Sequence, residues 1–274
     1  TPAVTTYNIT SITNSANLTA SAGSPVTGTG LLANEISNDA WTNTTATNQT
    51  IIYTVVPVAD NGCEGNAFTV TVTVNPEPVV ANQTKTVCSD AAVALTLATD
   101  ANTPTVASYN ITSISHANLT AFAGNPITAN GVTSSEITDD VWTNTTATAQ
   151  TVVYTIVPVA STTGCLGDPF TATITINPEP IVTNQTATVC SDIALNLNLA
   201  DLISGTGDTY SYTVSSSNQG SVPAGAARST ASALNITNTY NNVTGSDVIM
   251  TYTVTPYGVN GCAGNAFTYT VTVK

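Results

Sequence analysis

Charge is scarce in this sequence, and positive charge is almost absent. Only 7% of the 274 residues are charged, and 3 basic residues stand against 16 acidic ones. A soluble domain usually carries about a quarter charged residues. The formal net charge of -13 would repel a polyanion over most of the surface, so nucleic acid is not expected as a partner. Helix-forming Lys, Gln and Arg are also rare, while strand-favouring Thr and Val are abundant.

Long apolar runs and catalytic motifs are missing as well. No stretch approaches 18 apolar residues, so no membrane insertion is expected in this segment, and export signals are expected outside it. His116 is the single histidine, and the residues around it do not form a set of nucleophile, base and orienting acid. Because there is also no Gly-rich phosphate loop, HExxH or CxxC motif, we expect no enzyme and no cofactor.

What the sequence does contain is an internal repeat of about 102 residues. TYNITSITNSANLTA returns as SYNITSISHANLTA, and AWTNTTATNQTIIYTVVPVA returns as VWTNTTATAQTVVYTIVPVA. A third, more diverged copy is anchored by VCSD and NGCAGNAFTYTVTV. We place the boundaries at the NPEP tetrapeptides, which predicts domains over residues 1–76, 77–178 and 179–274.

The first copy is shorter than the others by about 26 residues at its start, which include the VCSD strand. Two interpretations are open. The sequence is a fragment of a longer array, or it is a subunit whose missing edge strands come from a neighbouring chain by β-augmentation.

Alternation of Thr with apolar residues predicts the last strand of each copy. It runs over Phe68–Val74, Phe170–Ile176 and Phe267–Val273. A second apolar run precedes each of these, which predicts a closing hairpin. Further strands are expected at KTVCSD, AVALTLA and YNITSI. About seven strands in about 100 residues predict an all-β fold of tandem immunoglobulin-like sandwiches, and the proline-stiffened linkers predict an end-to-end rod.

Five cysteines occupy two positions of the repeat. Cys88 and Cys190 lie in VCSD, and Cys63, Cys165 and Cys262 lie in the Gly-Cys loop before the last strand. One disulfide per repeat pairs Cys88 with Cys165. By the same rule Cys190 pairs with Cys262, and Cys63 stays unpaired because copy one lacks VCSD. Disulfides indicate an oxidising, extracellular setting.

The competing pairing crosses the linkers and joins Cys63 to Cys88 and Cys165 to Cys190. This pairing also forms two disulfides and leaves one cysteine unpaired. We prefer pairing within each repeat because the Gly-Cys loop and the next linker are expected at opposite poles of a sandwich. The next domain's cysteine would then lie far beyond the Cα separation of about 7 Å that a disulfide allows.

Acidic and aromatic residues offer the remaining candidate sites. Solvated turns are the preferred interpretation of two acidic clusters, with calcium as the alternative: Glu35, Asp39, Glu136, Asp139 and Asp140. Core packing is preferred over sugar stacking for six aromatic residues at fixed distances along the strands: Trp41, Tyr53, Trp142, Tyr154, Tyr240 and Tyr252.

The run WTNTTATAQTVVYTIVPVASTTGCLGDPFTATITINPEP, followed by TNQTATVCSD, closely resembles the PKD-like repeats of giant Bacteroidota cell-surface adhesins of the SprB gliding-motility type. That resemblance implies export by type IX secretion, association with the outer membrane through other parts of the protein, and adhesion or gliding motility. It carries no catalytic residues.

Three candidate functions follow. The first is a stalk or spacer in a secreted adhesin, whose partners are further copies of the same repeat. The alternatives are a module that binds surface glycans or proteins, and a subunit of an extracellular filament.

Overall fold

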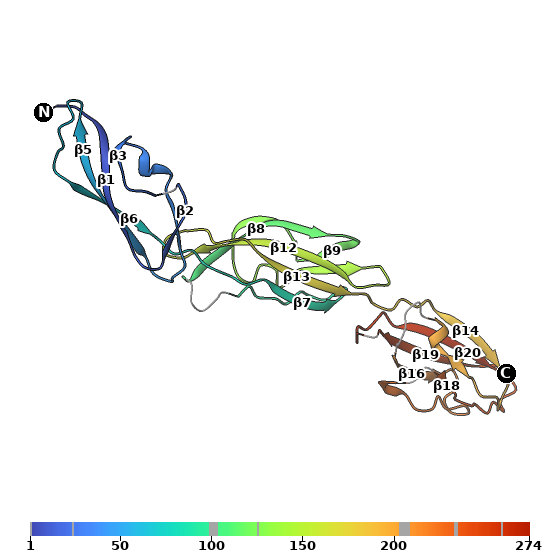
Figure 1. Ribbon diagram of the computed structural model, residues 1–274. Helices are drawn as coiled ribbons and strands as arrows, with labels where there is room; N and C mark the ends of the chain where they lie inside the picture. The colour runs from blue at the N-terminus through green and yellow to red at the C-terminus, as the bar shows by residue number, and fades with distance from the viewer. Residues whose placement is uncertain are drawn as a thin grey trace.

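The computed structural model describes residues 2–23, 25–98, 104–124, 126–202, 209–232, 235–258 and 260–274. Strands make up the regular structure of these residues, apart from two short 3-10 turns, η1 (Glu35–Asn38) and η2 (Leu199–Leu202). Three β-sandwich repeats follow one another along an elongated molecule, with the chain termini at opposite ends (Figure 1). The prediction of tandem all-β repeats is confirmed.

Repeat 1 has a four-stranded sheet in the order β3-β1-β5-β6 and a small second sheet, β2-β4. Its strands are β1 (Val4–Asn14), β2 (Leu18–Ala22), β3 (Gly28–Leu31), β4 (Ala40–Asn43), β5 (Gln49–Ala59) and β6 (Phe68–Val74). A small core lies between the two layers and contains Ile9, Leu18, Ile51, Tyr53 and Val55.

Repeat 2 adds a fifth strand to the large sheet, in the order β10-β8-β12-β13-β7, beside a small β11-β9 sheet. Its strands are β7 (Gln83–Cys88), β8 (Val106–His116), β9 (Leu119–Ala123), β10 (Ala129–Val132), β11 (Val141–Asn144), β12 (Gln150–Ala160) and β13 (Phe170–Asn177). The added strand β7 runs parallel to β13, whereas the other pairs are antiparallel.

Repeat 3 has the same plan, with the order β14-β20-β19-β16-β17 and a short β15-β18 pair. Its strands are β14 (Gln185–Val189), β15 (Leu197–Asn198), β16 (Thr209–Ser216), β17 (Arg228–Ser232), β18 (Asn235–Ile236), β19 (Val248–Tyr257) and β20 (Phe267–Val273). Here β14 runs parallel to β20.

The expected closing hairpins are present in all three repeats as β5-β6, β12-β13 and β19-β20. In β13 the apolar side chains of Phe170, Ala172, Ile174 and Ile176 are buried, while the intervening threonines are half-buried on the other face. A period of two places alternate side chains on opposite faces of a strand, so one face of this hairpin joins the core and the other presents hydroxyls to solvent.

The prediction of a strand at AVALTLA is wrong. Ala94 has a positive φ of 49°, which no regular strand contains. The main chain instead makes irregularly spaced hydrogen bonds to the loop before β11. The Val93 N–H donates to the Asp140 carbonyl, and the Leu97 N–H donates to the Ser134 carbonyl. Val93 and Leu97 are nevertheless buried in the core of repeat 2, so the segment acts as an apolar cover for one side of the sandwich.

Candidate functional site at the joints between repeats

The VCSD segment lies at the C-terminal pole of its repeat. Because β7 is parallel to β13, Cys88 lies opposite Asn177, the last residue of β13. The Ser89 N–H donates a 2.8 Å hydrogen bond to the Asn177 carbonyl. Repeat 3 has the same arrangement, since the Ser191 N–H donates to the carbonyl of Lys274 at 3.2 Å.

The Gly-Cys loop lies at the opposite, N-terminal pole, against the linker that enters the repeat. A Cβ added to Gly264 would lie 2.0 Å from the Pro180 carbonyl oxygen, and one on Gly167 would lie 1.9 Å from that of Pro78. No side chain fits in that space, so glycine is required for the loop to pack on the linker. The Gly-Cys loop of the following repeat thus packs on each linker, and the second linker is also flanked by the VCSD segment of repeat 2.

A disulfide joins these two elements across the second linker, between Cys88 of repeat 2 and Cys262 of repeat 3, with the Cα atoms 5.5 Å apart. This corrects the predicted bonds of Cys88 with Cys165 and of Cys190 with Cys262. Eight residues of β13 separate the two poles of repeat 2, which is about 26 Å at the rise of a strand and too far for a bond within the repeat.

The remaining cysteines are free thiols. Cys63 and Cys190 are exposed, and Cys165 is partly buried. Sequence reasoning identified the two cysteine positions but not the direction of the first strand of each repeat. That direction decides the pairing, because an antiparallel first strand would have placed Cys88 at the same pole as Cys165.

Both linkers contain a half-buried glutamate near another carboxylate. Burial raises the pKa of Glu77, and the nearby carboxylate of Asp168 raises it further. Burial likewise raises the pKa of Glu179, with a further contribution from Asp90. The second carboxylate comes from the Gly-Cys loop at the first joint and from the VCSD segment at the second. Each joint thus brings negative charge together, which the near absence of basic residues leaves unbalanced.

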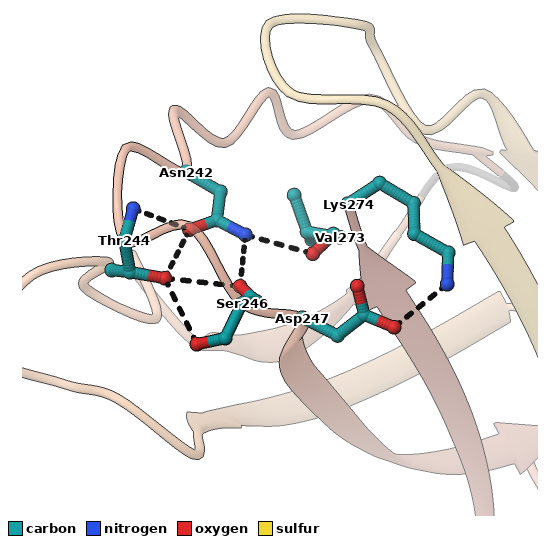
Figure 2. Close-up of polar contacts among 6 residues, drawn as sticks. All are labelled: Asn242, Thr244, Ser246, Asp247, Val273 and Lys274. Atoms are coloured by element: carbon teal, nitrogen blue, oxygen red, sulfur yellow. Dashed lines mark hydrogen bonds and ion pairs between the residues drawn. The ribbon is translucent and has the colours of Figure 1, made fainter.

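An asparagine clamp closes the C-terminal pole of every repeat. In repeat 3 the Asn242 side-chain amide donates to the carbonyls of Ser246 and Val273, at 2.8 and 3.0 Å (Figure 2). Its Oδ1 accepts from the Thr244 N–H and hydroxyl. An exposed ion pair lies alongside, with Lys274 Nζ 2.7 Å from Asp247 Oδ2. The clamp ties the loop before β19 to the end of β20.

Asn43 and Asn144 make the equivalent contacts in repeats 1 and 2, and both are buried. In repeat 2 the VCSD segment joins the clamp, since Ser89 Oγ accepts from the Asn144 N–H at 2.9 Å. Sequence reasoning did not select these asparagines, although the recurrence of TNTT in the first two copies was a signal that could have found them.

The acidic clusters do not come together as a cation site. Tyr154 donates to Asp140 at 2.7 Å and Tyr53 donates to Asp39 at 2.8 Å, so these two carboxylates serve tyrosines of the core. Three others lie at or near the surface: Glu35, Glu136 and Asp139. Among the described residues, no three His, Cys, Asp or Glu side chains are grouped so as to hold a metal ion.

The predicted core role of the aromatic residues is confirmed for five of the six. Four of them link in pairs: Trp142 Nε1 donates to the Tyr154 hydroxyl at 2.9 Å, and the hydroxyls of Tyr240 and Tyr252 lie 2.6 Å apart. All four, and Tyr53, are buried, and buried rings cannot stack on a sugar. Trp41 is half-buried and donates to Tyr53. His116 packs against Trp142, with ring centroids 4.7 Å apart.

The architecture defines a class of protein, tandem immunoglobulin-like β-sandwiches linked end to end. A family model described as PKD-like domain matches residues 3–78, 85–180 and 187–274. The chain therefore belongs to the PKD-like domain family and contains three of its repeats. No curated protein matches the sequence.

Solved structures similar to the chain include protocadherin gamma B2 extracellular cadherin domains 3-6, at 11% identity and a TM-score of 0.27, over 97% of this chain and 66% of that one. Mouse cadherin-23 EC22-24 has 10% identity and a TM-score of 0.27, over 98% and 85%. Bacteroides ovatus SGBP-B in complex with mixed-linkage heptasaccharide has 14% identity and a TM-score of 0.20, over 94% and 60%. Similarity at this level says nothing about function.

Proposed function

We propose that this chain is a non-catalytic spacer segment of a large secreted cell-surface adhesin. The observation that carries the proposal is the Cys88–Cys262 bond, because a covalent bridge across a joint is suited to a part that transmits force and maintains reach. A disulfide is also typical of extracellular domains. No helix among the described residues is long and apolar enough to cross a membrane.

The resemblance to Bacteroidota adhesins extends this proposal to a role in adhesion or gliding motility, with attachment to the outer membrane through parts outside these residues. Two features of the joints support a mechanical role. Each linker contains two prolines with restricted φ angles, and the Gly-Cys loop of the following repeat packs against each of them. Further copies of the same repeat are the expected neighbours in the chain.

Pulling the protein by its termini tests the proposal. With the bond intact, tension passes from Cys88 directly to Cys262, so the 174-residue separation between them is bypassed. The fully extended chain should then be shorter by about 600 Å than the chain without the bond, at roughly 3.4 Å per residue. Single-molecule force spectroscopy in oxidising and reducing buffer measures this difference.

Matched variants make the test specific. Cys88→Ser should give the long extension in both buffers, whereas Cys63→Ser, which removes a free thiol, should behave as the unmodified chain. An equal extension with and without reductant would contradict the proposal. A glycan-array screen of the same protein addresses the alternative of a binding module, since a spacer binds none of the glycans.

A filament subunit completed by a neighbour's strand is a second candidate. One observation favours it, the open edge of β6 in repeat 1, whose chemistry is developed below.

A further inference from the structure

Strand β6 of repeat 1 has a free edge where its counterparts are covered. In repeats 2 and 3 the corresponding strands, β13 and β20, each pair with a parallel neighbour, β7 or β14. Among the described residues of repeat 1, β6 pairs with β5 alone. Its main-chain N–H and C=O groups on the other side form an unpaired edge, which is a template for another strand.

Side chains on β6 are also more exposed than their counterparts in the other two repeats. Phe68 is 44% exposed, whereas its counterparts Phe170 and Phe267 are 2% and 3% exposed. Val72 is 39% exposed, whereas Ile174 and Val271 are fully buried. The same sequence pattern thus forms core in two repeats and surface in the third, and the difference is the missing cover.

An apolar groove of about 240 Å³ lies beside this edge, lined by residues that include Tyr7, Leu31, Ile36, Phe68 and Val70. In repeat 2 the chain that follows β7 covers the equivalent region, with Val93 and Leu97 buried and Leu95 partly buried against the core. In repeat 3 the same cover comes from Leu195, Leu197 and Leu199. Repeats 2 and 3 therefore each show the kind of apolar segment that fits this groove.

We propose that the β6 edge is an acceptor site for an extended segment of the Gln83–Leu97 type, supplied by PKD-like sequence outside these 274 residues. The segment pairs in parallel with β6, as β7 does with β13, and its three apolar residues after the cysteine fill the groove. Parallel register places the donor's cysteine opposite Asn75, as Cys88 lies opposite Asn177.

That register brings the donor's cysteine to the thiol of Cys165. The Gly-Cys loop of repeat 2 packs on Pro78 in the same way as the loop of repeat 3 packs on Pro180. Cys165 therefore has the same position relative to the end of β6 as Cys262 has relative to the end of β13. Cys165 is a free thiol and partly buried. The donor strand is thereby locked across the first joint by the bond already seen at the second.

The chemistry is thiol oxidation by a small disulfide such as oxidised glutathione. The donor thiolate attacks oxidised glutathione and releases one glutathione thiol. The Cys165 thiolate then attacks the donor sulfur of the mixed disulfide and releases the second. Two protein thiols become one disulfide, and one oxidised glutathione becomes two reduced molecules.

A synthetic peptide with the sequence of residues 79–98, VVANQTKTVCSDAAVALTLA, tests the proposal in a glutathione redox buffer. Two results are expected. The peptide becomes disulfide-bonded to Cys165, as mapped by mass spectrometry. The urea midpoint of the unfolding transition reported by Trp41 also rises by about 0.5 M or more as repeat 1 gains a ligand.

Three controls separate docking from adventitious disulfide exchange. A Cys165→Ser protein should lose the adduct and keep the shift of the Trp41 transition. A peptide with Cys88→Ser should do the same with the unmodified protein. A peptide with Val93→Asp, Leu95→Asp and Leu97→Asp should lose both, since charges cannot enter the apolar groove.

Adducts on Cys63 or Cys190 in place of Cys165 would overturn the proposal, as would a Trp41 transition that the peptide leaves unmoved. Disulfide-linked dimers through Cys165 in the absence of peptide would also overturn it, because a second copy would then be the occupant. None of these results bears on the spacer proposal, which is tested at the second joint.

Discussion

At the scale of single residues, Asp140 is the one acidic residue among the buried polar and charged side chains of the described structure. It is 2% exposed, and burial raises the pKa of its carboxyl from 3.8 to about 6, with the nearby acids Asp139 and Glu136 adding to the increase. The hydrogen bond from Tyr154 acts in the opposite direction. Between about pH 4 and pH 6 the folded protein therefore holds a proton on Asp140 that the unfolded chain has already released.

This raised pKa makes the stability of repeat 2 depend on pH. Folding favours the protonated carboxyl, so the contribution of this group to stability is fully present below about pH 4 and is lost as the pH rises through about 6. The loss amounts to about 3 kcal/mol, at 1.36 kcal/mol per pKa unit. We expect Asp140→Asn to remove this loss while keeping an oxygen acceptor for Tyr154. Urea unfolding followed through Trp142 at pH 4 and pH 7 measures the difference.

The same substitution at Asp39 is the matched control, because that carboxylate is half-buried and keeps contact with water. If the wild-type and Asp140→Asn proteins lost equal stability between the two pH values, the buried carboxyl would not be the cause of the pH dependence.

At the scale of elements, β6 and β13 share the same alternating sequence pattern but have different surroundings. Phe68 and Phe170 begin these strands, and only Phe170 lies under a cover segment. We expect Phe170→Ala to destabilise repeat 2 by about 3–5 kcal/mol, since truncation leaves a cavity in the core. Phe68→Ala should cost less, about 1 kcal/mol, because 44% of that residue is already exposed to water.

Chemical denaturation of the two variants, followed through Trp142 and Trp41 respectively, measures both costs. Equal losses in the two repeats would mean that the exposure of Phe68 does not describe the protein in solution.

The element scale is also where sequence reasoning reached its limit. The alternation of Thr with apolar residues predicted β6, β13 and β20, because every second residue of an amphipathic strand lies on its buried face. It misassigned the segment from Ala92 to Ala98, whose apolar residues reach the core through an irregular main chain with Ala94 at positive φ. Burial requires apolar residues but does not require a ladder, so composition alone could not distinguish the two.

At the scale of the whole molecule, three separate cores lie along the rod, and that of repeat 1 is the smallest and least covered. We expect repeat 1 to unfold first on heating or in urea. The two tryptophans of the chain report this directly, since Trp41 lies in repeat 1 and Trp142 in repeat 2.

Variants Trp41→Phe and Trp142→Phe isolate each signal. The transition that remains in Trp142→Phe should occur at lower urea than the one that remains in Trp41→Phe. Coincident transitions would contradict independent folding of the repeats.

The sequence by itself determined the repeat, the β-sandwich class and the two positions that the cysteines occupy. These properties are local or periodic, and they recur along the sequence. Only the tertiary structure decided which cysteines meet. The pairing depends on β7 running parallel to β13, a property of two strands far apart in the chain that no local pattern records, and that direction places Cys88 beside the next repeat rather than its own loop.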